Sequence, residues 1–447
     1  MHPFRTTSLR RAAVALALTL VASGSAVSAT TAATTASTPA SASGGHSSGG
    51  QSSAGATKRA WFTSWAQSQQ ELAPTPLRDQ SVRMITHLSQ GGGALRVRIQ
   101  NTFGTTPLTV DAATVGRSGQ GGAAIEGDIR TVTFDGRPEV VVPPGGEVWS
   151  DAAGLKTRAQ DDIAVSLSVS GTVTPGRHTG AFRSNYLTAP GSGDHTAEAS
   201  GSAYTQTVGS TYLVSAVDVH NPALKGTIVA FGSSVVDGTG SDNCGPGCTP
   251  DGTDHRWTDD VARRITAELP GTRQLAVANA GIGGTTSSAA CPRNPAGIRG
   301  LDAASRLDRD VLDLHGVTGV LYYYGTNDLA NGCAAAQILS SYDEVFQRLR
   351  AAGVKVYVTP ITSRPGYTDQ NNLDRHAVGT HVKKRNNCDG TCDGVMDFDQ
   401  VLKDPLKPNG INPAYDTGDG VHANIAGQRA LADFVSLPML LSSTTRR

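Results

Sequence analysis

Four short segments of the sequence carry the residue types of an acyl-transfer site. Ester cleavage at neutral pH needs a nucleophile, a base that takes its proton, a group that orients the base, and donors for the oxyanion. The segments are TIVAFGSSVVDG at 227–238, NAGIGG at 279–284, YGTND at 324–328 and DTGDGVH at 416–422. Each lies at or beyond an expected strand end, where open α/β sheets bind their ligands, so we expect them to meet at one edge of a sheet.

The serine and the histidine of these segments are the candidate nucleophile and base. Ser234 follows the apolar run 228–231, which is typical of a buried strand, at a Gly-Ser-Ser turn that can project its hydroxyl above a sheet. Asp419 stands three residues before His422, so its carboxylate can orient the imidazole ring. Asp416 is a second, less favoured candidate for this role. The structural alternative is a turn serine, a helix-capping aspartate and a surface histidine.

Candidate donors for the oxyanion follow two further strands. Asn327 comes after a strongly apolar run, and its side-chain NH₂ is an uncharged donor suited to charge that develops only in the transition state. Gly284 closes NAGIGG, and a backbone N–H without a neighbouring Cβ lets a substrate come close. The backbone N–H of Ser234 is the third candidate. The structural alternatives are ordinary glycine turns and an asparagine that bonds its own backbone.

Strands and helices alternate after Lys225 and would place these segments along one sheet. Expected strands cover 227–231, 275–279, 317–323, 354–360 and 395–398, and expected helices cover 256–269, 301–314, 335–352 and 425–434. Such alternation is typical of a parallel sheet with helices on both faces. The predicted fold class of the domain at 217–447 is therefore α/β, a flavodoxin-like three-layer parallel sheet. Arg364 and Tyr367, in the loop after the fourth strand, are candidate residues of the substrate pocket.

An all-β sandwich is predicted for residues 59–216. Apolar residues alternate with polar or small ones at 95–100 and 163–169, and Gly- and Pro-rich turns separate such runs. This accessory domain would bind polysaccharide or brace the second domain. Its tryptophans, Trp61, Trp65 and Trp149, are either stacking surfaces or core residues.

The amino terminus has the pattern of an exported protein. Arginines at 5, 10 and 11 precede an apolar run and then small residues, which predicts a signal peptide over 1–29. Residues 30–58 are rich in Ala, Ser, Thr and Gly, which predicts a disordered linker. No other apolar run approaches the roughly 18 residues of a membrane span. Lys plus Arg equals Asp plus Glu at 38 each, so bulk charge indicates no nucleic-acid or membrane partner.

Cysteines in an exported chain favour disulfide bonds. All six follow residue 240: Cys244, Cys248, Cys291, Cys333, Cys388 and Cys392. The close pairs Cys244/Cys248 and Cys388/Cys392 suggest disulfide bonds that each close a short loop, which leaves Cys291 to pair with Cys333. Six cysteines nevertheless allow 15 connectivities. A zinc site is the alternative, but neither close pair has the two-residue spacing of zinc knuckles, so no metal is expected.

Taken together, the four segments resemble blocks I, II, III and V of the SGNH (GDSL-type) hydrolase superfamily, over about 227–435. The resemblance implies Ser234 as nucleophile, His422 as base, Asp419 as its partner, and Gly284 and Asn327 as oxyanion donors with the Ser234 amide. Block I usually reads Gly-Asp-Ser, and here Ser233 replaces the aspartate, which keeps a hydrogen-bonding group but not the charge. The segment WFTSWA at 61–66 before a β-rich region is similar to secreted actinobacterial members of the XynE-like branch.

These expectations combine into a secreted, monomeric serine esterase that works through an acyl-enzyme without a cofactor. Acetyl or feruloyl esters on polysaccharide, or small esters, are the expected substrates. An extracellular lipase or phospholipase is the first alternative, although no long apolar lid segment is visible. The second is a non-catalytic polysaccharide-binding protein with a degenerate hydrolase domain, which the serine at position 233 makes conceivable.

Overall fold

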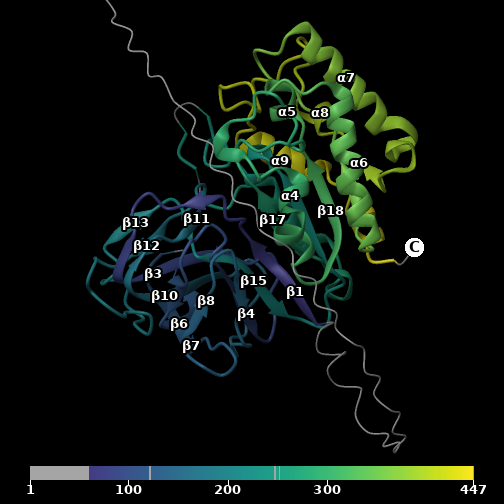
Figure 1. Cartoon of the computed structure of the whole chain (residues 1–447). Helices are drawn as coiled ribbons and strands as arrows, with labels where there is room; N and C mark the ends of the chain where they lie inside the picture. Colours follow the sequence, from purple (N-terminus) through teal and green to yellow (C-terminus); the bar gives the residue numbers. More distant parts are fainter. Residues whose placement is uncertain (1–59, 120–121, 246–247, 251, 446–447) are drawn as a thin grey trace, which may run out of the picture. The chain divides into compact units, whose positions relative to one another are not determined.

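The computed structural model describes residues 60–119, 122–245, 248–250 and 252–445 (Figure 1). The expected signal peptide (1–29) and linker (30–58) lie outside these residues. None of the described helices is both long and apolar enough to cross a membrane.

A five-stranded sheet forms the centre of the C-terminal part. Its strands are β16 (Thr227–Gly232), β17 (Ala276–Gly281), β18 (Val317–Tyr323), β19 (Lys355–Val358) and β20 (Gly394–Val395). They lie in the order β17-β16-β18-β19-β20, and every neighbouring pair is parallel. The chain leaves β16 for β17 on one side and then returns to β18 on the other. The carboxyl end of β16, where Ser234 follows, is thus the switch point at which such sheets bind ligands.

Alternation along β16 divides the sheet into two packed faces. Val229 and Phe231 join one hydrophobic cluster, and Ile228 and Ala230 join another. The first cluster includes residues of α4 (Ala303–Leu307), α6 (Ala335–Ala351) and α7 (Asp369–Lys383), and the second includes residues of α3 (Trp257–Glu268), α8 (Phe398–Leu402), α9 (Ile425–Phe434) and α10 (Leu437–Ser442). Helices therefore cover both faces, as the alternating pattern predicted.

Five helices and one strand end differ from the sequence expectation. The helices α5 (Thr326–Ala330), α7, α8 and α10 and the short α2 (Ser234–Asp237) were not predicted, and α7 is mostly polar along its length. The last expected strand, 395–398, is wrong at its end, because β20 stops at Val395 and Phe398 begins α8. The expected helix 301–314 is α4 followed by a π-helical turn, Asp308–Leu312.

Antiparallel strands make up the N-terminal part, as the period-two pattern predicted. One sheet has β1 (Trp61–Ala66), β15 (Val214–His220), β4 (Leu95–Gln100) and β9 (Glu147–Trp149); a second has β13 (Gln206–Val208), β12 (Asn185–Leu187), β3 (Leu77–His87), β10 (Asp162–Val173), β6 (Ala112–Ser118) and β7 (Ile125–Thr131). Smaller sheets join β14 (Thr211–Tyr212), β11 (Gly176–His178) and β2 (Glu71–Leu72), and β5 (Leu108–Val110) with β8 (Val140–Val142). The two large sheets share one hydrophobic cluster, to which β4 and β10 both contribute.

The strands from β1 to β15, called here the β lobe, adjoin the elements from β16 to α10, called the α/β lobe. The expected domain boundary after residue 216 falls inside β15. The N–H of Thr63 donates to the His315 carbonyl (3.0 Å), and the N–H of Val277 donates to the Ser89 hydroxyl (2.9 Å). The described residues of both lobes belong to one compact unit.

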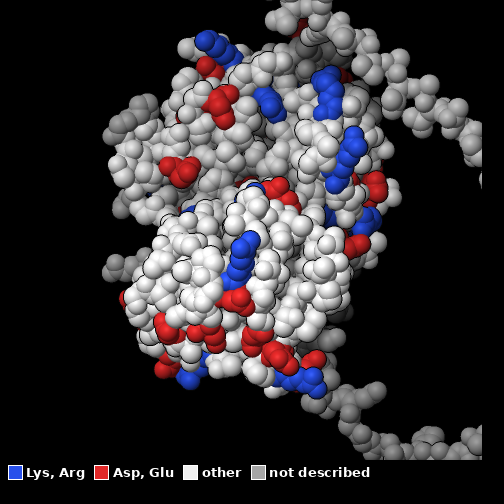
Figure 2. All heavy atoms as spheres, turned by 60° about the vertical axis from the view of Figure 1, so that its left-hand side comes forward, with Lys and Arg blue, Asp and Glu red and all other residues white. Residues whose placement is uncertain are grey.

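Two of the three tryptophans considered for stacking bind an arginine of their own chain. The Arg96 guanidinium lies 4.6 Å from the Trp61 ring centroid and 5.2 Å from that of Trp149. Cation–π contacts of this kind use one face of each ring. Acidic and basic side chains are interspersed on the face of the molecule shown in Figure 2.

Three disulfide bonds confirm the expected cysteine chemistry. The bonds join Cys244 to Cys248, Cys291 to Cys333, and Cys388 to Cys392. The Cys291–Cys333 bond spans 42 positions and links the loop after β17 to the short segment between α5 and α6.

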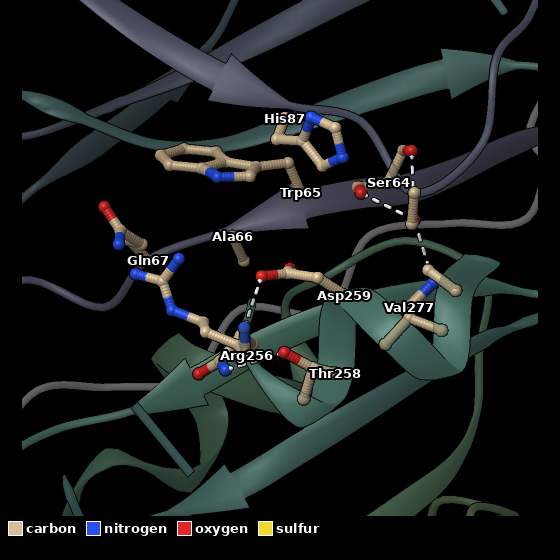
Figure 3. A pocket seen from close by; sticks show the side chains of 12 residues that line it. Ser64, Trp65, Ala66, Gln67, His87, Arg256, Thr258, Asp259 and Val277 are labelled. Carbon is tan, nitrogen blue, oxygen red and sulfur yellow. Dashed lines mark hydrogen bonds between the residues drawn. The ribbon is translucent and has the colours of Figure 1, made fainter. Parts of the chain in front are cut away.

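A small, partly open pocket of about 30 Å³ lies between the lobes, and Ser234 is not among the residues that line it. Side chains of β1 and of α3 face it, as Figure 3 shows for Trp65 and Asp259. His87 lines the pocket and hydrogen-bonds to Asp162 through Nδ1 (2.9 Å). Arg183 bonds to the same carboxylate (2.9 Å), so the lobe interface carries a buried ionic cluster.

Because of this cluster, we expect the folded protein to lose stability at alkaline pH. Burial alone lowers the pKa of His87, but the hydrogen bond to Asp162 and the charges of Asp254 and Asp259 raise it from 6.5 to about 9, while Arg183 opposes them with its own charge. Since the folded pKa is the higher one, His87 stabilises the fold fully below pH 6.5 and loses this contribution as pH rises through 9. We expect the free energy of unfolding to fall by up to about 3 kcal/mol across that window.

Urea titrations at pH 6.5, 8 and 9.5 measure this loss. His87→Gln removes the titrating group, so its free energy of unfolding should change much less over the same range. An equal decline in wild type and variant would assign the pH dependence to other groups.

Candidate active site

The structure brings together the three side chains that the sequence singled out. Ser234 Oγ lies 2.8 Å from His422 Nε2, although 188 positions separate them. His422 Nδ1 lies 2.6 Å from Asp419 Oδ2, on the opposite side of the ring. A carboxylate accepts only, so Nδ1 carries the proton, and Nε2 is left to accept the serine proton.

The carboxylate of Asp419 is held as an anion. Partial burial alone raises its pKa, but the bond from the His422 ring and the backbone N–H groups of His422 and Val421 lower it to about 2. Those N–H groups donate to Oδ1 at 2.9 and 2.8 Å. Asp416, the other candidate, accepts the Gly420 N–H (2.8 Å) and so shapes the loop instead of touching the ring.

Ser234 begins α2, a single turn held by side chains from elsewhere in the α/β lobe. Trp257 Nε1 donates to the carbonyl of Val235 (3.0 Å), and Asn279 Nδ2 donates to that of Val236 (2.6 Å). Arg256 Nε donates to the carbonyl of Asp237 (2.6 Å). Carbonyls at the end of a helix lack hydrogen-bond partners within the helix, and these three side chains donate the missing hydrogen bonds. A four-residue helix with no propensity pattern is thereby fixed under the nucleophile.

The β lobe also contacts α2. His178, on β11, bonds through Nε2 to Asp237 Oδ1 (2.9 Å) and through Nδ1 to the Ser68 carbonyl (2.8 Å). Both partners are buried, His178 at 1% and Asp237 at 5% exposed. Burial alone lowers the pKa of His178, but the charge of Asp237 raises it overall. No sequence pattern indicated that His178 and Asp237, which lie in different lobes, would pair.

A buried arginine fixes the strand ends beside the nucleophile. Arg306 donates to the carbonyls of Gly232 (2.8 Å) and Ala280 (2.7 Å), at the ends of β16 and β17. Its charge is balanced by Asp310 (2.9 Å). Burial alone raises the pKa of Asp310, and Arg309 and Arg306 lower it to about 2. This ion pair was not identified from the sequence.

The oxyanion candidates Gly284 and Asn327 lie on the loop after β17 and on α5. A Cβ added at Gly283 would lie 4.0 Å from Ser234 Cβ, so the glycine turn passes directly beside the nucleophile. Gly284 follows with a positive φ of 80° and is exposed. Its N–H donates no hydrogen bond within the described part of the chain, which leaves it available to a substrate. Asn327 Nδ2 donates to the Thr285 carbonyl (3.0 Å), which leaves its second N–H for an oxyanion.

Ser233 fills a tight site without forming a bond. It is 1% exposed, and its hydroxyl has no hydrogen-bond partner among the described residues. The serine therefore does not take over a hydrogen-bond network that an aspartate would make at this position.

Two groups of possible metal ligands lie elsewhere and do not fit a metal site. Cys291 and Cys333 lie near Asp328 but are bonded to each other. His87, Asp162 and Asp254 also lie close together, but Arg183 already binds both carboxylates.

One family model matches the part of the chain that holds these residues. Residues 230–430 match the model of the GDSL-like Lipase/Acylhydrolase family. Among solved structures, the chain is similar to the esterase EstA of Pseudoalteromonas sp. (18% identity, 47% of this chain, 93% of that chain, TM-score 0.35). It is also similar to a GDSL-like lipase of Bacteroides thetaiotaomicron (15% identity, 49% of this chain, 89% of that chain, TM-score 0.35). No curated protein matches significantly.

The family match covers the segments that hold Ser234, Gly284, Asn327, Asp419 and His422. Its description as a lipase and acylhydrolase family implies ester hydrolysis. The C-terminal part of this chain therefore has a GDSL-like α/β hydrolase fold, which supports its assignment to the GDSL/SGNH hydrolase superfamily.

Proposed function

We propose that the protein is a serine esterase that forms an acyl-enzyme. The observation that supports this most directly is the pair of bonds on the His422 ring, to Ser234 Oγ (2.8 Å) and to Asp419 (2.6 Å). In this proposal Ser234 Oγ attacks the ester carbonyl while His422 Nε2 takes the serine proton. The N–H groups of Ser234 and Gly284 and the amide of Asn327 bind the oxyanion.

The remaining steps use the same residues. His422 returns its proton to the leaving alcohol, which departs and leaves the acyl group on Ser234. A water molecule then gives His422 a proton and attacks the acyl carbonyl. The bond between the acyl carbon and Ser234 Oγ breaks, His422 returns the proton to Oγ, and the acid is released. Asp419 stays ionised throughout and stabilises the imidazolium.

The substrates that we propose are acetyl or feruloyl esters on polysaccharide, or small esters. The half-buried Ser234 and the exposed Gly284 support this, because residues that solvent reaches can also be reached by an ester carried on a bulky alcohol. The signal-peptide pattern supports secretion, and the WFTSWA segment supports the XynE-like branch. We propose that the protein is a monomer. The family description also names lipases, so a lipase is the second candidate.

A serine-directed fluorophosphonate, read by mass spectrometry, tests the proposal together with ester hydrolysis. We expect wild type to hydrolyse p-nitrophenyl acetate and to carry the label on Ser234. Ser233→Ala is the matched control: it removes a buried hydroxyl that forms no bond, so labelling and turnover should stay near the wild-type values.

Each other result has a defined meaning. A label on Ser233 would reassign the nucleophile, and absence of both label and turnover would favour a non-catalytic binding protein. Comparing kcat/KM for acetyl, feruloyl and long-chain esters separates the esterase from the lipase, which would prefer the long chain.

A further inference from the structure

Arg364 binds the side-chain oxygen of the oxyanion candidate Asn327. Its Nη1 donates to Asn327 Oδ1 at 2.9 Å. Arginine only donates and a backbone carbonyl only accepts, so the bonds to Arg364 and to the Thr285 carbonyl allow one orientation of the Asn327 amide. That orientation presents the amide NH₂, and not its oxygen, on the side of the glycine turn.

The charge of Arg364 is not balanced locally. No carboxylate of the described residues lies within ion-pair distance of its guanidinium, and the side chain is half-buried. A cation that donates to the oxygen of an amide draws electron density from its nitrogen, which strengthens the N–H as a donor. The arrangement therefore adds positive potential where the proposed reaction develops negative charge.

The loop that carries Arg364 is anchored on both sides. Tyr367 Oη donates to the carbonyl of Thr326 (2.8 Å), and Thr362 Oγ1 lies 3.0 Å from Tyr323 Oη. Pro365 packs against Gly420, where any Cβ would clash with the proline ring, and Gly420 is in the loop that carries His422. The guanidinium is thus held by a segment that contacts both α5, which carries Asn327, and the loop that carries His422.

Resting on the proposed esterase function, we infer that Arg364 is a positioning residue for the oxyanion site. It orients the Asn327 amide and polarises it toward the oxyanion. Its contribution is made in the transition state, so its loss should lower kcat much more than it raises KM.

A double-mutant cycle tests this role. Arg364→Met should lower kcat for p-nitrophenyl acetate by about 10- to 100-fold with KM within about 3-fold, below the 10²–10³-fold loss of an oxyanion donor. In the Asn327→Ala background the same substitution should cost less than about 3-fold, since its effect passes through the amide. Arg364→Lys keeps the charge and should recover part of the loss.

Arg350→Met is the matched control, because Arg350 is also half-buried and donates one hydrogen bond to a carbonyl, that of Gly390, away from the site. Its kcat should equal that of wild type. The inference would be overturned if Arg364→Met lowered kcat equally in the wild-type and the Asn327→Ala backgrounds. It would also be overturned if Arg350→Met lowered kcat as much and both variants had a lower melting temperature. A wild type without turnover would instead contradict the proposed function.

Discussion

Replacing Ser234 by alanine should lower kcat for p-nitrophenyl acetate by about 10⁶-fold, and His422→Ala should cost nearly as much. The two side chains share one proton across the 2.8 Å contact, so neither performs attack without the other. The double variant should therefore lose hardly more than either single variant. The turnover that remains would come from the oxyanion donors, which neither substitution removes.

Steady-state kinetics of the four proteins, with melting temperatures, measure this non-additivity. His381→Ala is the control, because His381 lies on α7, away from the triad segments, and should keep full activity. Additive losses in the double variant would mean that Ser234 and His422 act in separate steps, contrary to the mechanism.

The second large effect is a loss of stability on replacing His178, which lies between the lobes, by alanine. Its removal leaves the Asp237 carboxylate buried without a partner, and breaking a buried pair in this way typically costs about 3–5 kcal/mol. Asp237 ends the turn that begins with Ser234, so His178→Ala should also lower kcat. Replacing both partners, as in His178→Phe with Asp237→Leu, should restore part of the stability because no uncompensated charge remains.

Urea unfolding of the variants gives these free energies. The His195–Glu198 pair is a useful control, since it has a similar length (2.8 Å) but is exposed on the same lobe. His195→Ala should therefore change the free energy of unfolding by less than about 1 kcal/mol. A His178→Ala variant as stable as His195→Ala would show that the contact to Asp237 contributes nothing.

The sequence predicted those elements whose own residues favour them. β18 (Val317–Tyr323) and α9 (Ile425–Phe434) have the expected bounds, and α6 ends one residue early, since each has a continuous apolar run or a helical stripe. By contrast, α2 is a single turn fixed by side-chain donors from distant segments. The polar helix α7 buries few apolar residues, so periodicity could not identify it.

The same distinction holds at the site. Ser234, Asp419 and His422 were identified because each lies in a short segment with an interpretable spacing. His178 and Arg306 were not, because their partners are set by long-range packing of strands and lobes. Arg364 was named only as a pocket residue, since nothing in its loop indicated a bond to Asn327.

The Cys291–Cys333 bond joins the loop that carries Gly284 to the segment directly after α5, the helix that carries Asn327. A crosslink that closes 42 positions restricts the unfolded chain by about 4 kcal/mol in the chain-entropy model. Both sulfurs are buried, so the covalent tie belongs to the interior that supports the donors. The spacing between Gly284 and Asn327 is therefore coupled to the redox state of the surroundings: in a thiol-rich compartment the bond would be reduced, and the two candidate oxyanion donors would be held less rigidly.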